Sequence, residues 1–404
     1  MKTAFFFDIE SDGGGIFQHT KRYINSVLKL GLSDSELLII VNSKKISSSL
    51  KEKNIDHLLF DKNKFSIKLF LFLFNISFLK IIFVKFNIIN PFENFIKKNK
   101  VDLVIFNSPS YYIFYCKKIN YIFNIWNTEI KFYNFFPEFK KNLAYENQNN
   151  IIQEAVNNAF KIIVFTRQNR TDLKNLYSCD DSKIVEQIMI PNLPKIYEEN
   201  KNYDFSSFFS SIKINLKNQK FFLYPAQYYA HKNHKYLIEA INILKKNTKQ
   251  NFLFIFTGID KGNLLFLKNL VNSLNLNNEI KFYENIDDFK LISLYLGCDA
   301  LISSTYLGRI SLPLLEAFYF KKPIFYSKGI LDVEFEKRIY PFDLKDTSDF
   351  SSRIISFFNK ELNDDQFINS NKKYYDLNCN DEIFKNNYLK IITEYEFYHK
   401  KWEK

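Results

Sequence analysis

The chain has 404 residues, a formal net charge of +12, and 46% apolar and 25% charged residues. This length corresponds to two or three domains of about 150 residues each, enough to bury a large core without disulfides or metals. The composition excludes collagen, a coiled coil and wholesale disorder.

The positive charge has two readings, an anionic partner or codon drift. Only six of the 56 basic residues are Arg, and Lys, Asn, Ile and Phe are all in excess, as an AT-rich genome would produce. Proteins that bind nucleic acids often contact phosphates and bases through the two-pronged guanidinium group of Arg. We therefore predict no nucleic-acid partner, and the choice between drift and an anionic membrane surface stays open.

Cysteine spacing and hydropathy indicate a cytoplasmic protein. The chain lacks a CxxC pair, and its cysteines lie far apart, at Cys116, Cys179, Cys298 and Cys379. This spacing disfavours a zinc ribbon or a disulfide scaffold and favours a reducing compartment. The longest uncharged run in the most apolar stretch, 69–79, has 11 residues, whereas a membrane span needs about 20. The N-terminus reads as a first strand and not as a signal peptide.

Short β-rich runs alternate with helical periods along the first half. Strands are predicted at 3–8, 36–42, 102–106, 121–126 and 161–166. Helical segments lie between most of them, and the first helix, 16–30, is closed by Gly31. This alternation predicts βαβ units and a parallel sheet.

The alternation stops at 196–219, a polar and poorly periodic stretch, and then restarts. Strands follow at 221–225, 252–257, 279–283, 300–304 and 323–327, and helices near 233–246, 264–275, 288–297 and 312–320. An amphipathic helix, 382–402, ends the chain. We predict an α/β protein of two Rossmann-like domains, 1–200 and 201–380, that face a cleft, with 381–404 packing back toward the first.

The first candidate site is a glycine run between the first strand and the first helix. Three of the nine glycines are consecutive, Gly13, Gly14 and Gly15. Glycine lets backbone N–H groups approach a phosphate or a sugar at a helix N-terminus. A flexible turn is the alternative, but the scarcity of glycine elsewhere favours a binding loop.

The second candidate site is the run YPAQYYAHKNHK, from Tyr224 to Lys235. A strand ends here and a helix begins near Asn233, which is a good N-cap residue. Lys232 is thus expected beside unpaired N–H groups, flanked by His231 and His234. The alternative is a basic, solvated turn.

The third candidate site is the run STYLGRISLPLLEAF, from Ser304 to Phe318. A strand leads into a loop with Arg309, where a phosphate would sit, and then into a helix with Pro313 in its first turn. Glu316, one turn in, is placed to accept hydrogen bonds from a diol such as ribose. The alternative is a glutamate that only stabilises the helix dipole.

These runs, with LYLGCDALISS between them, resemble the donor domain of family 4 (group 1) retaining glycosyltransferases over about 220–346. The first half resembles the family more weakly. There DGGGIFQHT resembles the family's glycine loop, IWNTEIKFYNFFPEF its acceptor-side WD…H…PEFPE segment, and EAVNNAFKIIVFTRQNRTDL the following helix and strand. The resemblance implies a GT-B fold.

The resemblance also implies roles for residues on the donor side. The family's Arg and Lys that grip the donor diphosphate fall on Gln227 and Lys232, so the Arg is missing and Arg309 is expected to supply part of the charge. The second glutamate of the family's pair is Glu316, expected on the ribose. The first falls on Gly308, in a branch that carries Tyr-Leu-Gly there. The remaining implied donor contacts are Gly13, Gly14, Gly15, Asn285, Ile310, Ser311 and Leu312.

The acceptor side departs further from the family. Ile130 falls where the family's segment has its His. The remaining candidates beside the reaction centre are His19, Asn127 and Glu129.

The resemblance implies retaining transfer of a hexosyl group from a nucleotide-diphosphate sugar to a glycan or lipid-linked glycan, as in surface polysaccharide or lipopolysaccharide biosynthesis. No metal and no cofactor are expected, since Lys232, Arg309, helix N-termini and loop N–H groups can stabilise the leaving diphosphate. Two alternatives stay open: a non-catalytic member that binds a nucleotide sugar or glycan, and a sugar-nucleotide epimerase.

The Phe- and Leu-rich segment 64–85 carries Lys64, Lys68, Lys80 and Lys85. It lies in the first half, where such enzymes hold the acceptor. It is either a helix that docks on the inner face of the membrane or an ordinary core helix.

Overall fold

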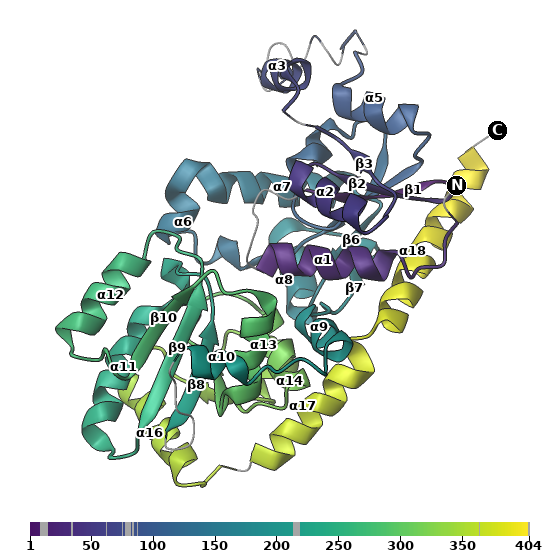
Figure 1. Ribbon diagram of the computed structural model, residues 1–404. Coiled ribbons are helices and arrows are strands. Elements are labelled where there is room, and N and C mark those ends of the chain that lie inside the picture. The colour runs from purple at the N-terminus through teal and green to yellow at the C-terminus, as the bar shows by residue number, and fades with distance from the viewer. Residues whose placement is uncertain are drawn as a thin grey trace.

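The computed structural model describes residues 1–8, 15–33, 35–61, 63–74, 76, 82, 85–86, 88–212, 219–362 and 364–402. Two α/β halves, each built on its own parallel sheet, lie side by side, and the last two helices run along both (Figure 1).

The first half is built on a seven-stranded sheet in the order β3-β2-β1-β4-β5-β6-β7, with every pair parallel. Its central strands are buried on both faces, which explains their continuous apolar runs such as LVIF in β4. The strands are β1 (Thr3–Phe7), β2 (Leu37–Val41), β3 (Leu58–Leu59), β4 (Leu103–Phe106), β5 (Asn120–Asn124), β6 (Lys161–Val164) and β7 (Ile184–Glu186).

Helices cover both faces of this sheet. Capping side chains start several of them; the Asn90 side chain, for example, accepts a hydrogen bond from the Glu93 N–H and begins α5. The helices are α1 (Gly15–Val27), α2 (Lys44–Glu52), α3 (Phe65–Phe74), α5 (Pro91–Lys98), α6 (Pro137–Lys140), α7 (Ala144–Asn158), α8 (Arg167–Tyr177) and α9 (Leu193–Glu199), with the short turns η1 (Tyr111–Tyr115), η2 (Glu129–Lys131), η3 (Lys141–Leu143) and η4 (Asp181–Lys183).

The second half repeats the design with a six-stranded parallel sheet in the order β10-β9-β8-β11-β12-β13. Its strands are β8 (Lys220–Pro225), β9 (Phe252–Gly258), β10 (Ile280–Glu284), β11 (Ala300–Ser303), β12 (Ile324–Ser327) and β13 (Tyr340–Phe342). Its helices are α10 (Ser207–Ser211), η6 (Ala230–Lys232), α11 (His234–Asn247), α12 (Leu264–Ser273), α13 (Asp288–Gly297), α14 (Leu312–Tyr319), α15 (Val333–Glu336) and α16 (Thr347–Phe358).

The C-terminal helices tie the halves together. α17 (Asp364–Asn378) packs on α14, and α18 (Asp381–Trp402) then crosses back to pack on α1 (Figure 1). Asp381 pairs with Arg22 at 2.5 Å and accepts a hydrogen bond from the Ser26 hydroxyl at 2.8 Å. The predicted return of the last helix to the first domain is therefore confirmed.

The predicted strands are all present, within one or two residues at most ends, and three short edge strands were missed: β3, β7 and β13. Edge strands of two or three residues carry too little periodicity to be recognised. The predicted division at residue 200 falls between β7 and β8, in a stretch that holds α9 and α10. The exact domain limits stay a prediction.

The cysteines and the hydropathy of the chain can also be compared with the structure. All four cysteines are free and buried. In the described part of the chain, no helix is long and apolar enough to cross a bilayer.

Candidate donor site

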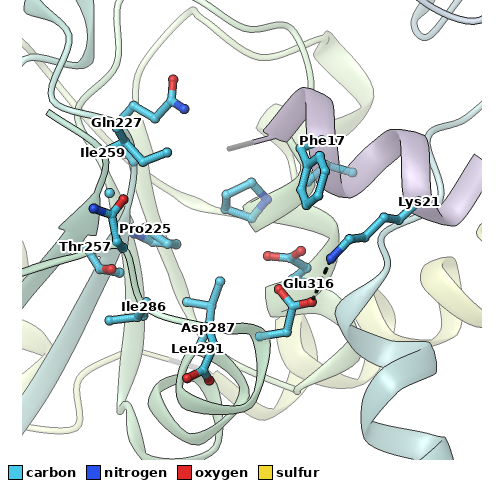
Figure 2. A pocket seen from close by; sticks show the side chains of 16 residues that line it. Phe17, Lys21, Pro225, Gln227, Thr257, Ile259, Ile286, Asp287, Leu291 and Glu316 are labelled. Atoms are coloured by element: carbon cyan, nitrogen blue, oxygen red, sulfur yellow. Dashed lines mark ion pairs between the residues drawn. The ribbon is translucent and has the colours of Figure 1, made fainter. Parts of the chain in front are cut away.

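A cavity of about 390 Å³ opens between the two halves, at the carboxyl ends of β8, β9 and β10 (Figure 2). This is the edge of a parallel sheet at which ligands bind in open α/β folds. Its lining residues are Phe17, Lys21, Pro225, Ala226, Gln227, Thr257, Gly258, Ile259, Asn285, Ile286, Asp287, Asp288, Leu291, Leu312, Pro313 and Glu316.

Gly258 allows the loops after β8 and β9 to close one wall of the cavity. A Cβ atom at this position would lie 2.3 Å from the Ala226 carbonyl oxygen, a distance that real side chains do not reach. Only glycine lets the two backbones approach this closely. Gly258 was not predicted, because the approach of these two loops is not visible in the local sequence.

Glu316 lies at the floor of the cavity because of how α14 begins. The Ser311 side chain caps the helix by accepting from the Leu314 N–H at 3.3 Å, and Pro313 occupies the first turn. Glu316 is buried and accepts a hydrogen bond from the Tyr295 hydroxyl at 2.7 Å. Burial raises the pKa of Glu316 to about 7, while the Tyr295 hydrogen bond acts in the opposite direction. A buried carboxylate with unused acceptor capacity is suited to bind the hydroxyls of a ligand.

The first half contributes two residues to the cavity that the sequence analysis missed. Phe17 and Lys21, one turn apart on α1, face Glu316 across the opening (Figure 2). The Lys21 ammonium lies 3.9 Å from an Asp288 carboxylate oxygen on α13, so this ion pair bridges the two halves. The i, i+4 spacing of Phe17 and Lys21 after the glycine run was the available signal that they share one face of α1. That Asp288 is the partner of Lys21 depends on the tertiary structure.

Asn285 and Asp287 belong to the part of the cavity lining that the second half contributes. Asn285 adopts a left-handed conformation with φ of 51° directly after β10. The Asp287 side chain caps α13 by accepting from the Lys290 N–H at 2.9 Å. The Asp287 carboxylate is thus engaged at the start of a helix.

Lys232 does not line the cavity but lies in the neighbouring loop, at the end of η6. Its carbonyl oxygen accepts hydrogen bonds from the Tyr224 and Ser304 hydroxyls at 2.7 and 3.2 Å. Lys232 is only partly exposed, which argues against the alternative of a basic, solvated turn. Burial lowers the pKa of Lys232 to about 8. The negative charges of Glu129 and Glu138, both in the first half, act in the opposite direction and raise this pKa.

The two histidines beside Lys232 do not form a solvated turn. His234 is fully buried among the rings of Tyr224, Tyr228 and Phe256, and burial lowers its pKa to about 3. Asn233 precedes α11 as predicted, but with φ of 52° and without a side-chain capping bond. The expected capping role of Asn233 is therefore wrong, because in the left-handed conformation its side chain makes no bond to the first turn of the helix.

Arg309 faces the first half rather than the cavity. Its backbone N–H donates to a Glu129 carboxylate oxygen at 2.7 Å, and its guanidinium lies 3.6 Å from Glu129 and 3.8 Å from Asp172. Glu129 is buried, and burial raises its pKa. The neighbouring Gly308 has φ of +116°, which a side chain would strain. Whether Arg309 serves a diphosphate stays a prediction.

The other predicted residues are dispersed. Ser311 caps α14, Ile310 is buried in the core of the second half, and Asn127 is partly exposed on the first half. His19 is buried among Tyr23, Trp126 and Phe165, and burial lowers its pKa to about 3. Gly15 begins α1, while Gly13 and Gly14 lie outside the described residues. Of the predicted donor residues, the cavity brings together Gln227, Asn285, Leu312 and Glu316.

Within the described ranges, no group of three or more His, Cys, Asp and Glu side chains is arranged to hold a metal ion. The independence of the chain from metals stays a prediction.

Most residues that line the cavity lie in a region that matches a protein-family model. Residues 207–374, which supply most of its lining, match the model of the glycosyl transferases group 1 family. The second half of the chain is thus similar to a group 1 glycosyltransferase domain. A search of curated proteins found no match to this sequence.

Solved structures have a similar fold along nearly the whole length of the chain. HepE of Anabaena, solved with UDP and glucose, has a TM-score of 0.73 at 12% identity, covering 98% of this chain and 100% of HepE. WaaG, a glycosyltransferase involved in lipopolysaccharide biosynthesis, has a TM-score of 0.65 at 13% identity, with 95% and 98% covered. Sucrose-phosphate synthase from Thermosynechococcus elongatus has a TM-score of 0.71 at 13% identity, with 98% and 99% covered. The fold of the chain is therefore GT-B.

Proposed function

We propose that this protein transfers a hexosyl group from a nucleotide-diphosphate sugar to a glycan or lipid-linked glycan, with retention at the anomeric carbon and without a metal ion. We assign it to the family 4 branch that carries Tyr-Leu-Gly, at 306–308, in place of the first glutamate. The observation that carries the proposal is Glu316, a buried carboxylate on the floor of an interdomain cavity within a group 1 glycosyltransferase domain. HepE, which has the same fold, was solved with UDP-glucose.

The proposed mechanism assigns binding and charge stabilisation to this chain's residues. Glu316 accepts hydrogen bonds from the ribose hydroxyls, and the apolar side chains of Ile286 and Leu291 enclose the base. As the bond between the anomeric carbon and the phosphate oxygen breaks, negative charge grows on the leaving diphosphate. Lys232 supplies a preorganised positive charge there, since Gln227 stands where the family has its Arg.

A panel of nucleotide sugars tests the function. We expect the correct donor, at about 100 times its Kd, to stabilise the protein by about 2.7 kcal/mol and to raise the midpoint of thermal unfolding by about 2–4 °C. Free nucleotide should then accumulate only when donor and acceptor are mixed. No stabilisation by any nucleotide sugar would contradict the proposal.

A non-catalytic binding protein is the second candidate. It is favoured by Gln227 and Gly308 at two family positions and by the engagement of Arg309 with first-half carboxylates. The same panel separates the two, because a binding protein would be stabilised by a nucleotide sugar without releasing the nucleotide in the presence of any acceptor.

The first-half wall of the cavity gives a separate prediction. Phe17→Ala removes apolar surface that would cover the nucleotide, so we expect UDP to bind about 3- to 10-fold more weakly. Titration calorimetry with UDP measures this effect, with Lys51→Ala on exposed α2 as control. Unchanged affinity would mean that α1 does not touch the nucleotide.

We further propose a cytoplasmic protein that docks on an anionic membrane surface through α3. One face of α3 packs against the first-half core through Ile67 and Phe70. Its other face exposes Phe65, Leu69 and Phe72, which are 80%, 46% and 66% exposed, and α3 lies at the end of the first half that is farther from the second half (Figure 1). The rest of 64–85 lies largely outside the described residues.

Sedimentation with liposomes tests this docking. We expect the bound fraction to rise with anionic lipid, since each Lys near such a surface adds about 1 kcal/mol. It should fall with salt, because surface charge is screened within about 10 Å at 0.1 M. The double variant Phe65→Ser/Phe72→Ser should stay in the supernatant. Equal recovery of the unaltered protein with and without anionic lipid would contradict docking.

A further inference from the structure

The segment around α6 makes a direct contact with the loop that carries Lys232. One carboxylate oxygen of Glu138, on α6 in the first half, accepts from the backbone N–H of His231 at 3.0 Å. The same oxygen is hydrogen-bonded to Nδ1 of the His231 ring. The ring also stacks on Phe139, with centroids 5.9 Å apart and an interplanar angle of 21°. Both side chains of the Glu138–His231 pair are only 13% exposed.

His231 is also held from the second half, but through its other backbone group. Its carbonyl oxygen accepts from the Tyr306 N–H at 2.9 Å. Tyr306 in turn packs on Phe136 of the first half, at 5.4 Å between centroids. The first half therefore holds His231 by its backbone N–H and its ring, and the second half holds it by its carbonyl oxygen.

Charge links the same pair to Lys232. The carboxylates of Glu138 and Glu129 both favour the charged ammonium of Lys232, which burial disfavours. Burial alone would raise the pKa of Glu138, but the hydrogen bonds from His231 bring it below its usual value, so Glu138 is ionised at neutral pH. Glu138 is therefore placed both to hold the loop and to keep Lys232 charged.

We propose that Glu138 is a positioning residue of the donor site, which holds the Lys232 loop in place across the interdomain cleft through His231. The segment 137–139, which sequence resemblance assigns to the acceptor side, thereby acts on the donor. The inference rests on the proposed function for the role of Lys232, whereas the contact between the halves stands independently of it.

Four variants and a control test the proposal by titration calorimetry with UDP. Glu138→Ala removes the acceptor of two hydrogen bonds and should weaken UDP binding about tenfold, whereas Glu138→Gln keeps an acceptor oxygen and should stay within about threefold of the unaltered protein. His231→Phe keeps the ring stack and loses the ring hydrogen bond, so about threefold is expected. In a Lys232→Ala background, Glu138→Ala should change UDP affinity by less than about twofold, since its effect passes through Lys232. Exposed Glu146→Ala is the control.

A conformational measurement separates this proposal from the proposed function. Spin labels at Lys53 and Leu265, exposed positions on the two halves, report the distance between them by double electron–electron resonance. We expect one dominant distance for the unaltered protein and for Glu138→Gln, and an added longer distance for Glu138→Ala.

If the unaltered protein does not bind UDP or any nucleotide sugar, the proposed function fails while the spin-label distances still report on Glu138. If Glu138→Ala folds and leaves either the distance distribution or the UDP affinity unchanged, the positioning role is overturned. The positioning role would also be overturned if Glu138→Ala weakened UDP binding by the same factor in the Lys232→Ala background as in the unaltered protein. Should Glu138→Ala fail to fold, His231→Phe decides, and unchanged affinity in that variant contradicts the proposal.

Discussion

Replacing Lys232 with alanine is expected to lower sugar transfer at least about 100-fold, the usual scale for losing one preorganised charge at a developing anion. The structure strengthens the reason for this expectation. Lys232 is partly buried beside the cavity, where a charge interacts more strongly than in water, and two carboxylates of the opposite half favour its charged form. Initial rates of nucleotide release, with donor and acceptor both saturating, measure the effect.

Lys235→Ala is the matched control for Lys232. It lies three residues on, at the start of α11, is 55% exposed, and pairs with Glu239 at 3.6 Å. We expect full activity in this variant. Because Lys232 is partly buried, its alanine variant must also be compared in thermal unfolding. A folded Lys232→Ala protein with full transfer would show that the phosphate assignment is wrong.

Glu316→Gln is expected to weaken nucleotide binding by about 1.5–3 kcal/mol, because the variant keeps its shape but loses charge-assisted acceptance from the ribose hydroxyls. This corresponds to an increase in Kd of about 10- to 150-fold. Titration calorimetry with UDP measures it, with Glu239→Gln, remote from the cavity lining, as control. Unaltered affinity would mean that Glu316 only stabilises α14.

The raised pKa of Glu316 adds a dependence on pH. Burial places it at about 7, so the carboxylate is protonated as pH falls from 8 to 6. Over that range UDP affinity of the unaltered protein should fall relative to that of Glu316→Gln, in which Lys232, with a pKa of about 8, still gains charge as pH falls. Between pH 4.5 and 7 the folded state binds this proton more tightly than the unfolded state, so the contribution of Glu316 to stability falls as pH rises. Glu316→Gln lacks this loss and should gain stability relative to the unaltered protein from pH 5 to pH 8 in thermal unfolding.

Local patterns in the sequence were enough to predict the two parallel sheets and the helix that closes the chain. Strand and helix periods are local patterns, so β1, α13 and α14 could be located from their own residues. The helix start that carries Glu316 was visible for the same reason, since Ser311 and Pro313 signal it within four residues. The edge strands β3, β7 and β13 were too short for such patterns.

The contacts across the cleft could not be predicted from local patterns in the sequence. Lys21 with Asp288, Glu138 with His231, and Arg309 with Glu129 and Asp172 all join residues of opposite halves. No local period encodes such a contact, because it depends on how the two sheets are placed by α17 and α18. Burial also depends on the tertiary structure. The sequence left open a solvated turn at Lys232 and His234, yet packing buries His234 among aromatic rings and partly buries Lys232, and burial lowers the pKa of both.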